Sequence, residues 1–243
     1  MKMILPLLLA GFSAAAQNID LTGNTIIQPG DAIIRYDWIK PAHDFYRNTV
    51  TDSAGNIRYD FVMEDFTIID SVRKQIVFAR YRQVPPGSFS TDTSFTDLTL
   101  NPLTMHELFF QREVGFEMSF GDELASVRTI RKGVGTIKTY PMKRGYFENN
   151  MIEYVFGWLE LKKGVTYTLD NFNKDAASPS EPYTVDYAFD DAWILGAGSR
   201  IDCRVIRFVH GSTSGYVWVD KASHQVLKEE GSFKGGMYVM TKI

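Results

Sequence analysis

The sequence predicts a mainly β protein built on one large, curved antiparallel sheet, with one helix lying over the concave face of that sheet. Three observations support this fold class. Residues 204–242 contain four short runs of β-branched and aromatic residues separated by turn formers. Aromatic residues make up 14% of the chain, which favours strands over a helical bundle. One segment, residues 150–164, has the periodicity of a helix.

The C-terminal segment predicts an antiparallel meander. Its four runs cover residues 204–209, 216–219, 226–230 and 237–242. The gaps are rich in Gly, Ser and Asp and are too short for crossover helices, so consecutive runs are expected to pair as hairpins. In the third run, two apolar residues are followed by Lys228, Glu229 and Glu230. We therefore expect this strand to enter solvent or to form an edge of the sheet.

Residues 1–16 predict a secretion signal that is cleaved from the mature protein. Lys2 provides a positive start, Ile4–Phe12 form an apolar core, and three alanines ending at Ala16 form a small-residue cleavage site. The apolar core is too short to span a bilayer. We therefore expect an exported protein with the periplasm as its compartment and with no transmembrane segment in the mature chain.

Most of the mature chain is divided into strands by turn formers. The expected strands cover residues 32–40, 57–69, 75–83, 106–112, 116–120, 124–140 with a break near Gly133, 165–169 and 183–189. Residues 87–106 are rich in Ser, Thr and Asp and lack a clear period, which predicts a long surface loop held at its far end by three leucines. No repeat, charge run or linker-like segment divides the chain. Residues 17–243 are therefore expected to form a single domain.

The helical segment has an amphipathic pattern. At about 100° per residue, one continuous arc collects the apolar residues Met151, Ile152, Tyr154, Val155, Trp158 and Leu159. Asn150 and Glu153 have the spacing of a capping box, and Lys162-Lys163-Gly164 is a suitable C-terminal stop. Its apolar arc can be interpreted as packed core or as one wall of a cavity, because a single helix can hardly cover the whole face of a large sheet.

The composition narrows the classes of partner and of site. The formal net charge is −3 at pH 7, which does not favour a nucleic acid or an anionic membrane surface. The single cysteine, Cys203, lies in an expected strand and has no intrachain partner, so we expect a buried, inert thiol. None of the four histidines has a second ligand at metal-binding spacing, so no metal site or other cofactor is predicted.

Three local patterns resemble catalytic motifs, and none is complete. Gly211–Gly215 resembles a nucleophile elbow, but its central residue is Thr213 and a strand follows it in place of a helix. Ser71 and Lys74 match S-x-x-K without the companion motifs. The paired carboxylates at 190–191 and 229–230 are adjacent on strands, so each pair points to opposite faces, and we interpret them as solvated. No catalytic residue is predicted, and we expect a protein that is not an enzyme.

Two segments, Asn150–Gly164 and Tyr216–Lys228, carry a resemblance to a known superfamily. The first is a helix followed by a Gly-led strand, and the second resembles a closing hairpin in which an aromatic-apolar-Asp strand end turns back into a Val/Leu-Lys strand. In this order of features the chain resembles an exported bacterial family of unknown function within the LolA-like superfamily of periplasmic lipoprotein carriers. The resemblance implies a curved half-barrel with a lid helix and an apolar interior that suits acyl chains. It implies no catalytic residues.

These observations lead to one main hypothesis and one alternative. The main hypothesis is an exported, non-enzymatic protein that binds a lipid-like or other apolar ligand in the concave face of the half-barrel. Its expected ligand-binding residues are Met151, Tyr154, Val155, Trp158 and Leu159. The alternative is a cell-envelope interaction module with a filled core, no small-molecule ligand, and a partner protein on residues 87–106 or on a sheet edge. The space under the helix distinguishes them, because it is empty in the first and filled in the second.

Overall fold

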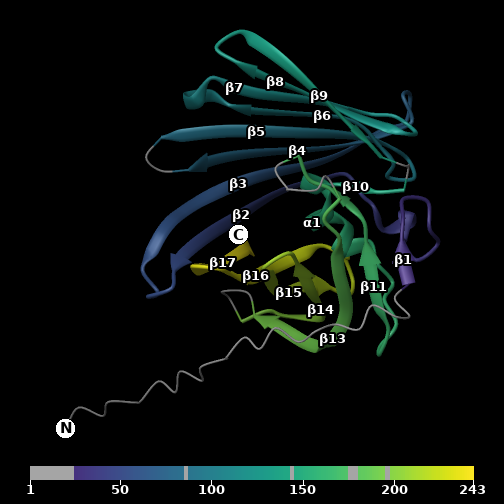
Figure 1. Ribbon diagram of the computed structural model, residues 1–243. Helices are drawn as coiled ribbons and strands as arrows, with labels where there is room; N and C mark the ends of the chain where they lie inside the picture. The colour runs from purple at the N-terminus through teal and green to yellow at the C-terminus, as the bar shows by residue number, and fades with distance from the viewer. Residues whose placement is uncertain (1–24, 85–86, 143–144, 175–179, 195–197) are drawn as a thin grey trace.

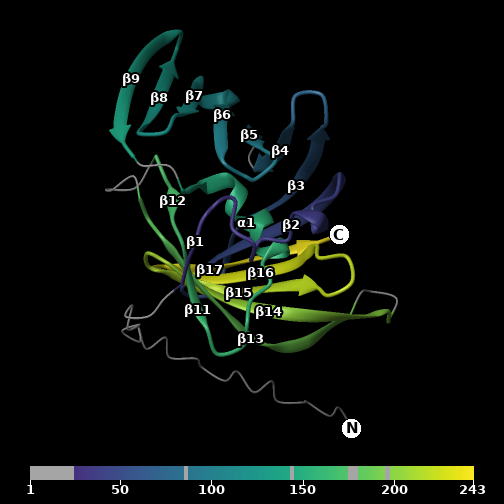
Figure 2. The same ribbon diagram turned by 90° about the vertical axis from the view of Figure 1, so that its right-hand side faces the viewer.

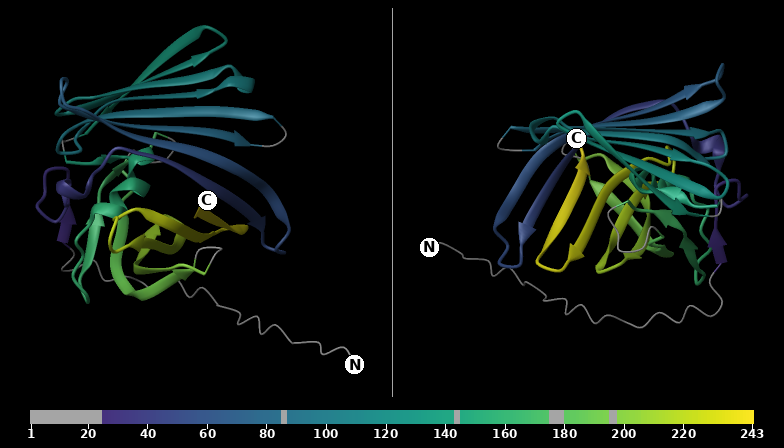
Figure 3. Two further views of the ribbon diagram at one scale, coloured as in Figure 1. Left: turned by 180° about the vertical axis from the view of Figure 1, so that it is seen from behind. Right: turned by 45° about the horizontal axis from the view of Figure 1, so that its top comes forward.

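The computed structural model describes residues 25–84, 87–142, 145–174, 180–194 and 198–243. Within them, fifteen strands form one sheet in the order β1-β11-β13-β14-β15-β16-β17-β2-β3-β4-β5-β6-β7-β8-β9. All neighbouring strands are antiparallel except β1 and β11, which are parallel. The sheet curls around α1 (Ile152–Val155) without closing into a barrel (Figures 1 and 3). This architecture confirms the predicted mainly β fold with one short helix.

The sheet joins the two ends of the described chain. β17 (Gly236–Lys242) pairs with β2 (Ala42–Asp52), so the C-terminal meander continues directly into the N-terminal strands. The other strands of the first half are β1 Thr25–Ile27, β3 Ile57–Asp70, β4 Gln75–Val84, β5 Ser88–Asp97, β6 Pro102–Phe109, β7 Val114–Phe120, β8 Leu124–Arg131 and β9 Val134–Pro141. Those of the second half are β11 Thr166–Leu169, β13 Tyr183–Ile194, β14 Arg200–His210, β15 Thr213–Asp220 and β16 Val226–Phe233. A separate parallel pair, β10 (Phe147–Glu148) and β12 (Asn171–Phe172), lies under β6 to β9 (Figure 2).

The predicted C-terminal meander is confirmed, with longer strands than the sequence indicated. The four runs become β14 to β17, each paired in antiparallel fashion with the next. Gly215 is required for the contact between β15 and β16, because a Cβ there would lie 1.9 Å from the backbone oxygen of Glu230. The predicted signal, residues 1–16, lies outside the described residues.

The prediction of a long surface loop over residues 87–106 is wrong. Most of this stretch forms β5 and the start of β6, joined by a tight turn in which the Asp97 carboxylate accepts hydrogen bonds from the backbone N–H groups of Thr99 and Asn101. The inward side chains of β5 are buried but polar; they are Ser90, Asp92, Ser94 and Thr96. Phe89 and Phe95 alternate with them on the outer face. The strand therefore alternates with a period of two, but its buried face is polar and its outer face carries the aromatic residues. A search for buried apolar residues misses such a strand.

The predicted strand over residues 32–40 is also wrong. It contains a 3₁₀ turn, Tyr36–Trp38, and its main link to the rest of the fold is an isolated bridge between Ile34 and Leu159. The backbone N–H of Arg35 donates to the oxygen of Trp158 at 2.9 Å, and that of Glu160 donates to the oxygen of Ile33 at 2.9 Å. The segment pairs with the chain that leaves the helix, so it does not join the sheet.

The predicted helix over residues 150–164 is shorter than expected. Asn149–Met151 form a 3₁₀ turn, α1 follows, and Phe156–Trp158 form a second 3₁₀ turn. The helix ends there because Leu159 turns to an extended conformation and bridges to Ile34. The predicted capping box is also wrong, since the cap is Glu148, whose carboxylate accepts a hydrogen bond from the Asn150 N–H at 2.9 Å. We call residues 149–158 the helical segment.

The main core lies between the helical segment and the concave face of β13 to β17 and β2 to β4. Its fully buried members include Phe147, Met151, Ile152, Val155, Phe156, Leu159, Ile206, Val217 and Val219. Gly157 allows the closest approach, because a Cβ at this position would lie 2.4 Å from the backbone oxygen of His224 in the β15–β16 turn. A second cluster under β6 to β8 contains Met105, Met118 and Phe172. The helical segment is therefore fixed against the sheet on one side.

Candidate functional site

The five residues predicted to bind a ligand fall into two groups. Met151, Val155 and Leu159 have no exposed surface and belong to the packed core. Tyr154 and Trp158 line a pocket, and both rings pack against Phe78 of β4, with centroid distances of 5.0 and 5.7 Å. The helical arc thus contributes to both core and cavity wall. Ligand binding by these residues stays a prediction.

The pocket, which we call the concave pocket, has a volume of about 460 Å³. It lies between the helical segment, the inner face of β2 to β4 and the β15–β16 turn. Its aromatic and apolar lining consists of Trp38, Ala42, Tyr46, Tyr154, Trp158, Ala222, Val226 and Met240. At its mouth, the rings of Trp38 and His224 stack with centroids 3.6 Å apart. A cavity of this size is in the range that holds small-molecule ligands.

Three charged residues, Asp65, Arg80 and Glu153, form the floor of the concave pocket, and we call them the floor triad. The guanidinium of Arg80 donates to both carboxylate oxygens of Asp65 at 2.7 Å and to the carboxylate of Glu153 at 2.5 Å. The Arg80 and Asp65 side chains are 5% and 3% exposed, whereas that of Glu153 is 35% exposed. Burial alone would lower the pKa of Arg80, but Asp65 and Glu153 outweigh it and raise that pKa.

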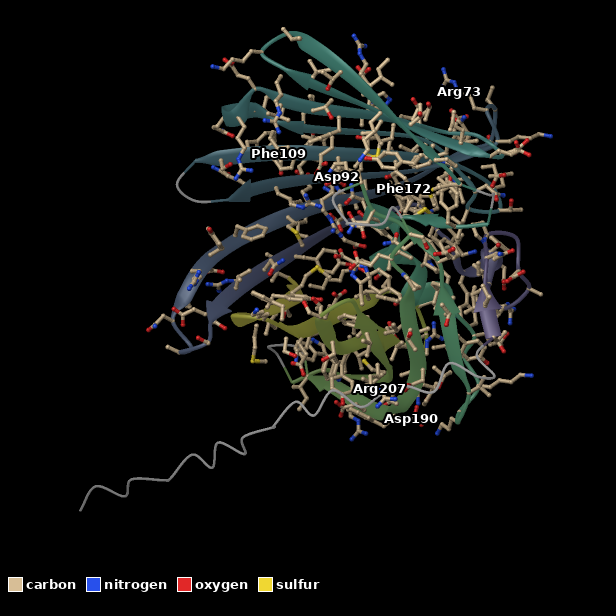
Figure 4. The ribbon with its side chains drawn as sticks, in the orientation of Figure 1. Arg73, Asp92, Phe109, Phe172, Asp190 and Arg207 are labelled. Atoms are coloured by element: carbon tan, nitrogen blue, oxygen red, sulfur yellow. The ribbon has the colours of Figure 1, made fainter. Side chains whose placement is uncertain are left out.

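Two members of the floor triad, Asp65 and Arg80, belong to a row of buried charges across four strands. Asp65 of β3, Arg80 of β4, Asp92 of β5 and Glu107 of β6 lie directly opposite one another on the concave face. Arg82 pairs with Asp92 at 2.8 Å, and Lys174 pairs with Glu107 at 3.0 Å. Figure 4 places Asp92 in the interior of the molecule and Arg73 and Arg207 at its periphery. This concave face is therefore charged where most sheets are apolar.

Two carboxyl groups of this region have raised pKa values. Burial raises the pKa of Asp92 to about 6, against the opposing effects of Arg82 and Arg80. Burial also raises the pKa of Glu148 to about 7, although its carboxylate accepts hydrogen bonds from the Ser94 hydroxyl at 2.6 Å and from the Asn150 N–H. Glu148 therefore caps the helical segment and links it to β5, and its protonation changes near neutral pH.

The predicted solvated edge at residues 228–230 is wrong. β16 is an interior strand of the sheet, and Glu229 points to the concave face with 3% exposure. Its Oε1 atom accepts a hydrogen bond from the Tyr238 hydroxyl at 2.5 Å. Burial, followed by the charge of Glu153, raises the pKa of Glu229 to about 8. The paired glutamates alternate faces as expected, but the inner one is buried on the concave face.

The contacts of two histidines and of the cysteine matter because these residue types can bind metals or act as nucleophiles. His43 contacts Glu64 at 2.8 Å, and the His210 ring stacks on Tyr183 with centroids 3.9 Å apart. In the described part of the chain, no three histidine, cysteine or carboxylate side chains are grouped so as to hold a metal ion. Cys203 is buried, and burial raises the pKa of its thiol, which disfavours the reactive thiolate. Among the described helices, none has the length and apolar character needed to cross a bilayer.

Sequence reasoning missed the charged half of the site. Asp65 and Arg80 lie on strands that have apolar residues on both faces, and Glu153 was assigned to a helix cap. One local signal was present, since the inward positions of β5 are polar at a spacing of two. A period of two identifies a strand but does not tell which face is buried.

Comparison with known proteins adds a family and a fold. The structure is similar to the crystal structure of a β-barrel-like protein of the domain of unknown function DUF1849 from Brucella abortus, with a TM-score of 0.55 and 12% sequence identity. The match covers 86% of this chain and 97% of that chain, and at this identity it supports the fold alone. No curated protein matches the sequence. The resemblance to LolA-like carriers is not confirmed. Residues 43–241 match the family described as protein of unknown function (DUF3108), and the chain belongs to this family.

Proposed function

We propose that this DUF3108 protein is an exported, non-enzymatic binding protein whose concave pocket holds a ligand with an apolar body and one polar end. The observation that carries the proposal is the pocket of about 460 Å³ between the helical segment and the sheet, with aromatic walls and a charged floor. Export to the periplasm is part of the proposal and rests on the predicted signal in residues 1–16. The charged floor narrows the expected ligand from a wholly apolar molecule to an amphipathic one.

Burial of the apolar body supplies the affinity in this proposal. Trp38, Tyr46, Trp158 and Met240 belong to the apolar lining of the pocket, and Trp38 is the most exposed of the four. Each methylene group transferred from water to such a surface contributes about 0.8 kcal/mol. An alkyl or acyl segment of several carbons is therefore held without a charged partner, and the polar end determines selectivity.

Native mass spectrometry of the signal-free protein tests the proposal directly. The protein is expressed with export to the periplasm, and anything it releases on organic extraction is identified. We expect a stoichiometric amphipathic adduct. A clean apo mass, with no shift when fatty acids, alkylamines or phospholipids are added, would contradict the proposal.

Filling the concave pocket should abolish binding. Ala42 lines the pocket from the first position of β2, so Ala42→Trp places a large ring in the cavity. We expect the affinity for an alkyl ligand to fall at least tenfold, while the melting temperature changes little because the added ring occupies empty space. The matched control is Ala54→Trp in the exposed β2–β3 turn. Equal binding by both variants would locate the ligand elsewhere.

The open sheet favours a second candidate, an interaction module of the cell envelope. β9 is an edge strand, and Val134 and Ile137 are each 69% exposed. Such an edge can accept an extended segment of another protein as an added strand. We then expect an identified envelope protein to co-purify with the wild type and with Ala42→Trp, and to be lost with Ile137→Asp. Retention by Ile137→Asp would argue against this edge.

A further inference from the structure

The floor triad has more negative than positive charge. Arg80 is shared between Asp65, which it contacts through two parallel hydrogen bonds, and Glu153, which it contacts through one. One guanidinium therefore faces two carboxylates. The buried Asp65 has the more complete pairing, and the excess negative charge lies on Glu153, whose side chain is 35% exposed. This carboxylate lines the concave pocket from the helical segment.

The other charges around the pocket do not cancel this excess. Asp37 pairs with Arg35 at 3.1 Å, and Asp44 pairs with Lys242 at 2.6 Å. Lys40 also lines the pocket, but it is exposed to solvent, where its field is screened. The charge of Glu153 also contributes to the raised pKa of the neighbouring Glu229, which is consistent with a negative field at the floor.

Aromatic side chains surround the same carboxylate. Tyr154 follows Glu153 directly in the helical segment, and Trp158 lies one turn further along. The Tyr154 ring already lies 5.3 Å from the guanidinium carbon of Arg80, which shows that this surface accepts a cation. The Tyr154 hydroxyl is buried and has no hydrogen-bond partner among the described residues.

We propose that the polar end of the ligand is a cation, an amine or alkylammonium group, which lies against Glu153 and Tyr154 while its apolar body contacts Trp158 and Met240. This inference rests on the proposed function of the concave pocket. An anionic end would have to displace Glu153 from Arg80 or lie beside two carboxylates. The first leaves Glu153 without its cation, and the second brings like charges together. A cation forms a charge-assisted hydrogen bond with Glu153, whose negative charge Arg80 does not fully compensate. It also interacts favourably with the faces of the aromatic rings.

Three ligands with the same alkyl chain separate the charge preference from pocket binding itself. Dodecylammonium, dodecanol and dodecanoate are titrated into the signal-free protein at neutral pH, below their micelle concentrations, with calorimetric detection. We expect dodecylammonium to bind at least tenfold more tightly than dodecanoate, with dodecanol between them. Equal or tighter binding of dodecanoate overturns the cation assignment and leaves the proposed function intact. If none of the three ligands binds, both the cation assignment and the proposed function are contradicted.

The variant Glu153→Gln identifies the residue responsible. Glutamine keeps an oxygen for Arg80 and removes the charge, so the preference for dodecylammonium over dodecanol should fall about tenfold. The control is Glu117→Gln on the outer face of β7, where Glu117 pairs with Arg128 at 3.0 Å. An unchanged preference in Glu153→Gln, or an equal loss in Glu117→Gln, would overturn the assignment.

Discussion

Methionine in place of Arg80 is expected to lower the free energy of unfolding by about 3–5 kcal/mol, because it leaves the buried Asp65 carboxylate without its cation. Asp65 is 3% exposed and receives two hydrogen bonds from Arg80, and Glu153 loses its link to the sheet in the same variant. For a domain of this size the melting temperature should fall by roughly 10 °C. Thermal unfolding followed by circular dichroism near neutral pH measures the change.

A matched pair of the same chemistry lies on the outer face of the neighbouring strands. Arg47 of β2 contacts both carboxylate oxygens of Asp60 of β3, but the arginine side chain is 61% exposed. Arg47→Met should therefore cost less than about 1 kcal/mol. If the two variants lose the same stability, the buried row of charges does not hold the sheet together. If Arg80→Met is neutral, the pocket floor tolerates unpaired carboxylates.

The contrast between these two arginines also explains how far the sequence could predict the fold. β4 was predicted from its alternation and β3 from the turn formers that precede it, because both signals are local properties of the chain. The alternation does not identify which face is buried, so Arg80 and Arg47 look alike in the sequence. β5 was missed for the same reason, because its inward positions Ser90 and Asp92 are polar. Only the long-range pairing of the strands decides which face is enclosed.

The candidate site was predictable in part. The helical period placed Tyr154 and Trp158 on the apolar arc, and both line the concave pocket. The same arc includes Met151 and Val155, which are fully buried, since a period cannot separate core from cavity wall. The hydrogen bond between Arg80 and Glu153 joins residues 73 positions apart. No local pattern contains that information.

The buried glutamates should make stability depend on pH in the direction opposite to a paired surface carboxylate. Burial raises the pKa of Glu148 to about 7 and, with the charge of Glu153, that of Glu229 to about 8. In the unfolded chain both titrate near the ordinary value of about 4.3. Between the unfolded and the folded pKa of each group, the folded protein binds more protons than the unfolded chain. The stability that each group contributes is therefore fully present below the unfolded pKa and is lost as the pH rises through the folded pKa.

Removing the charge with glutamine isolates this effect from the histidines. Burial lowers the pKa values of His210 and His224, so these two residues make the protein less stable as the pH falls. This effect opposes that of the buried glutamates. The quantity to measure is therefore the difference in the free energy of unfolding between each variant and the wild type. We expect Glu148→Gln and Glu229→Gln each to raise the free energy of unfolding by about 2–4 kcal/mol at about pH 8 and to change it little at about pH 4.

The control for this experiment is Glu117→Gln, because Glu117 is 43% exposed and paired with Arg128 on the outer face. It should not change the pH profile. A constant difference between Glu148→Gln and the wild type at all pH values would mean that Glu148 stays ionised in the core. In that case the cap of the helical segment would be held by its hydrogen bonds to Ser94 and Asn150 alone. A difference that grows with pH instead makes this carboxyl a proton-binding group within the fold that carries the concave pocket.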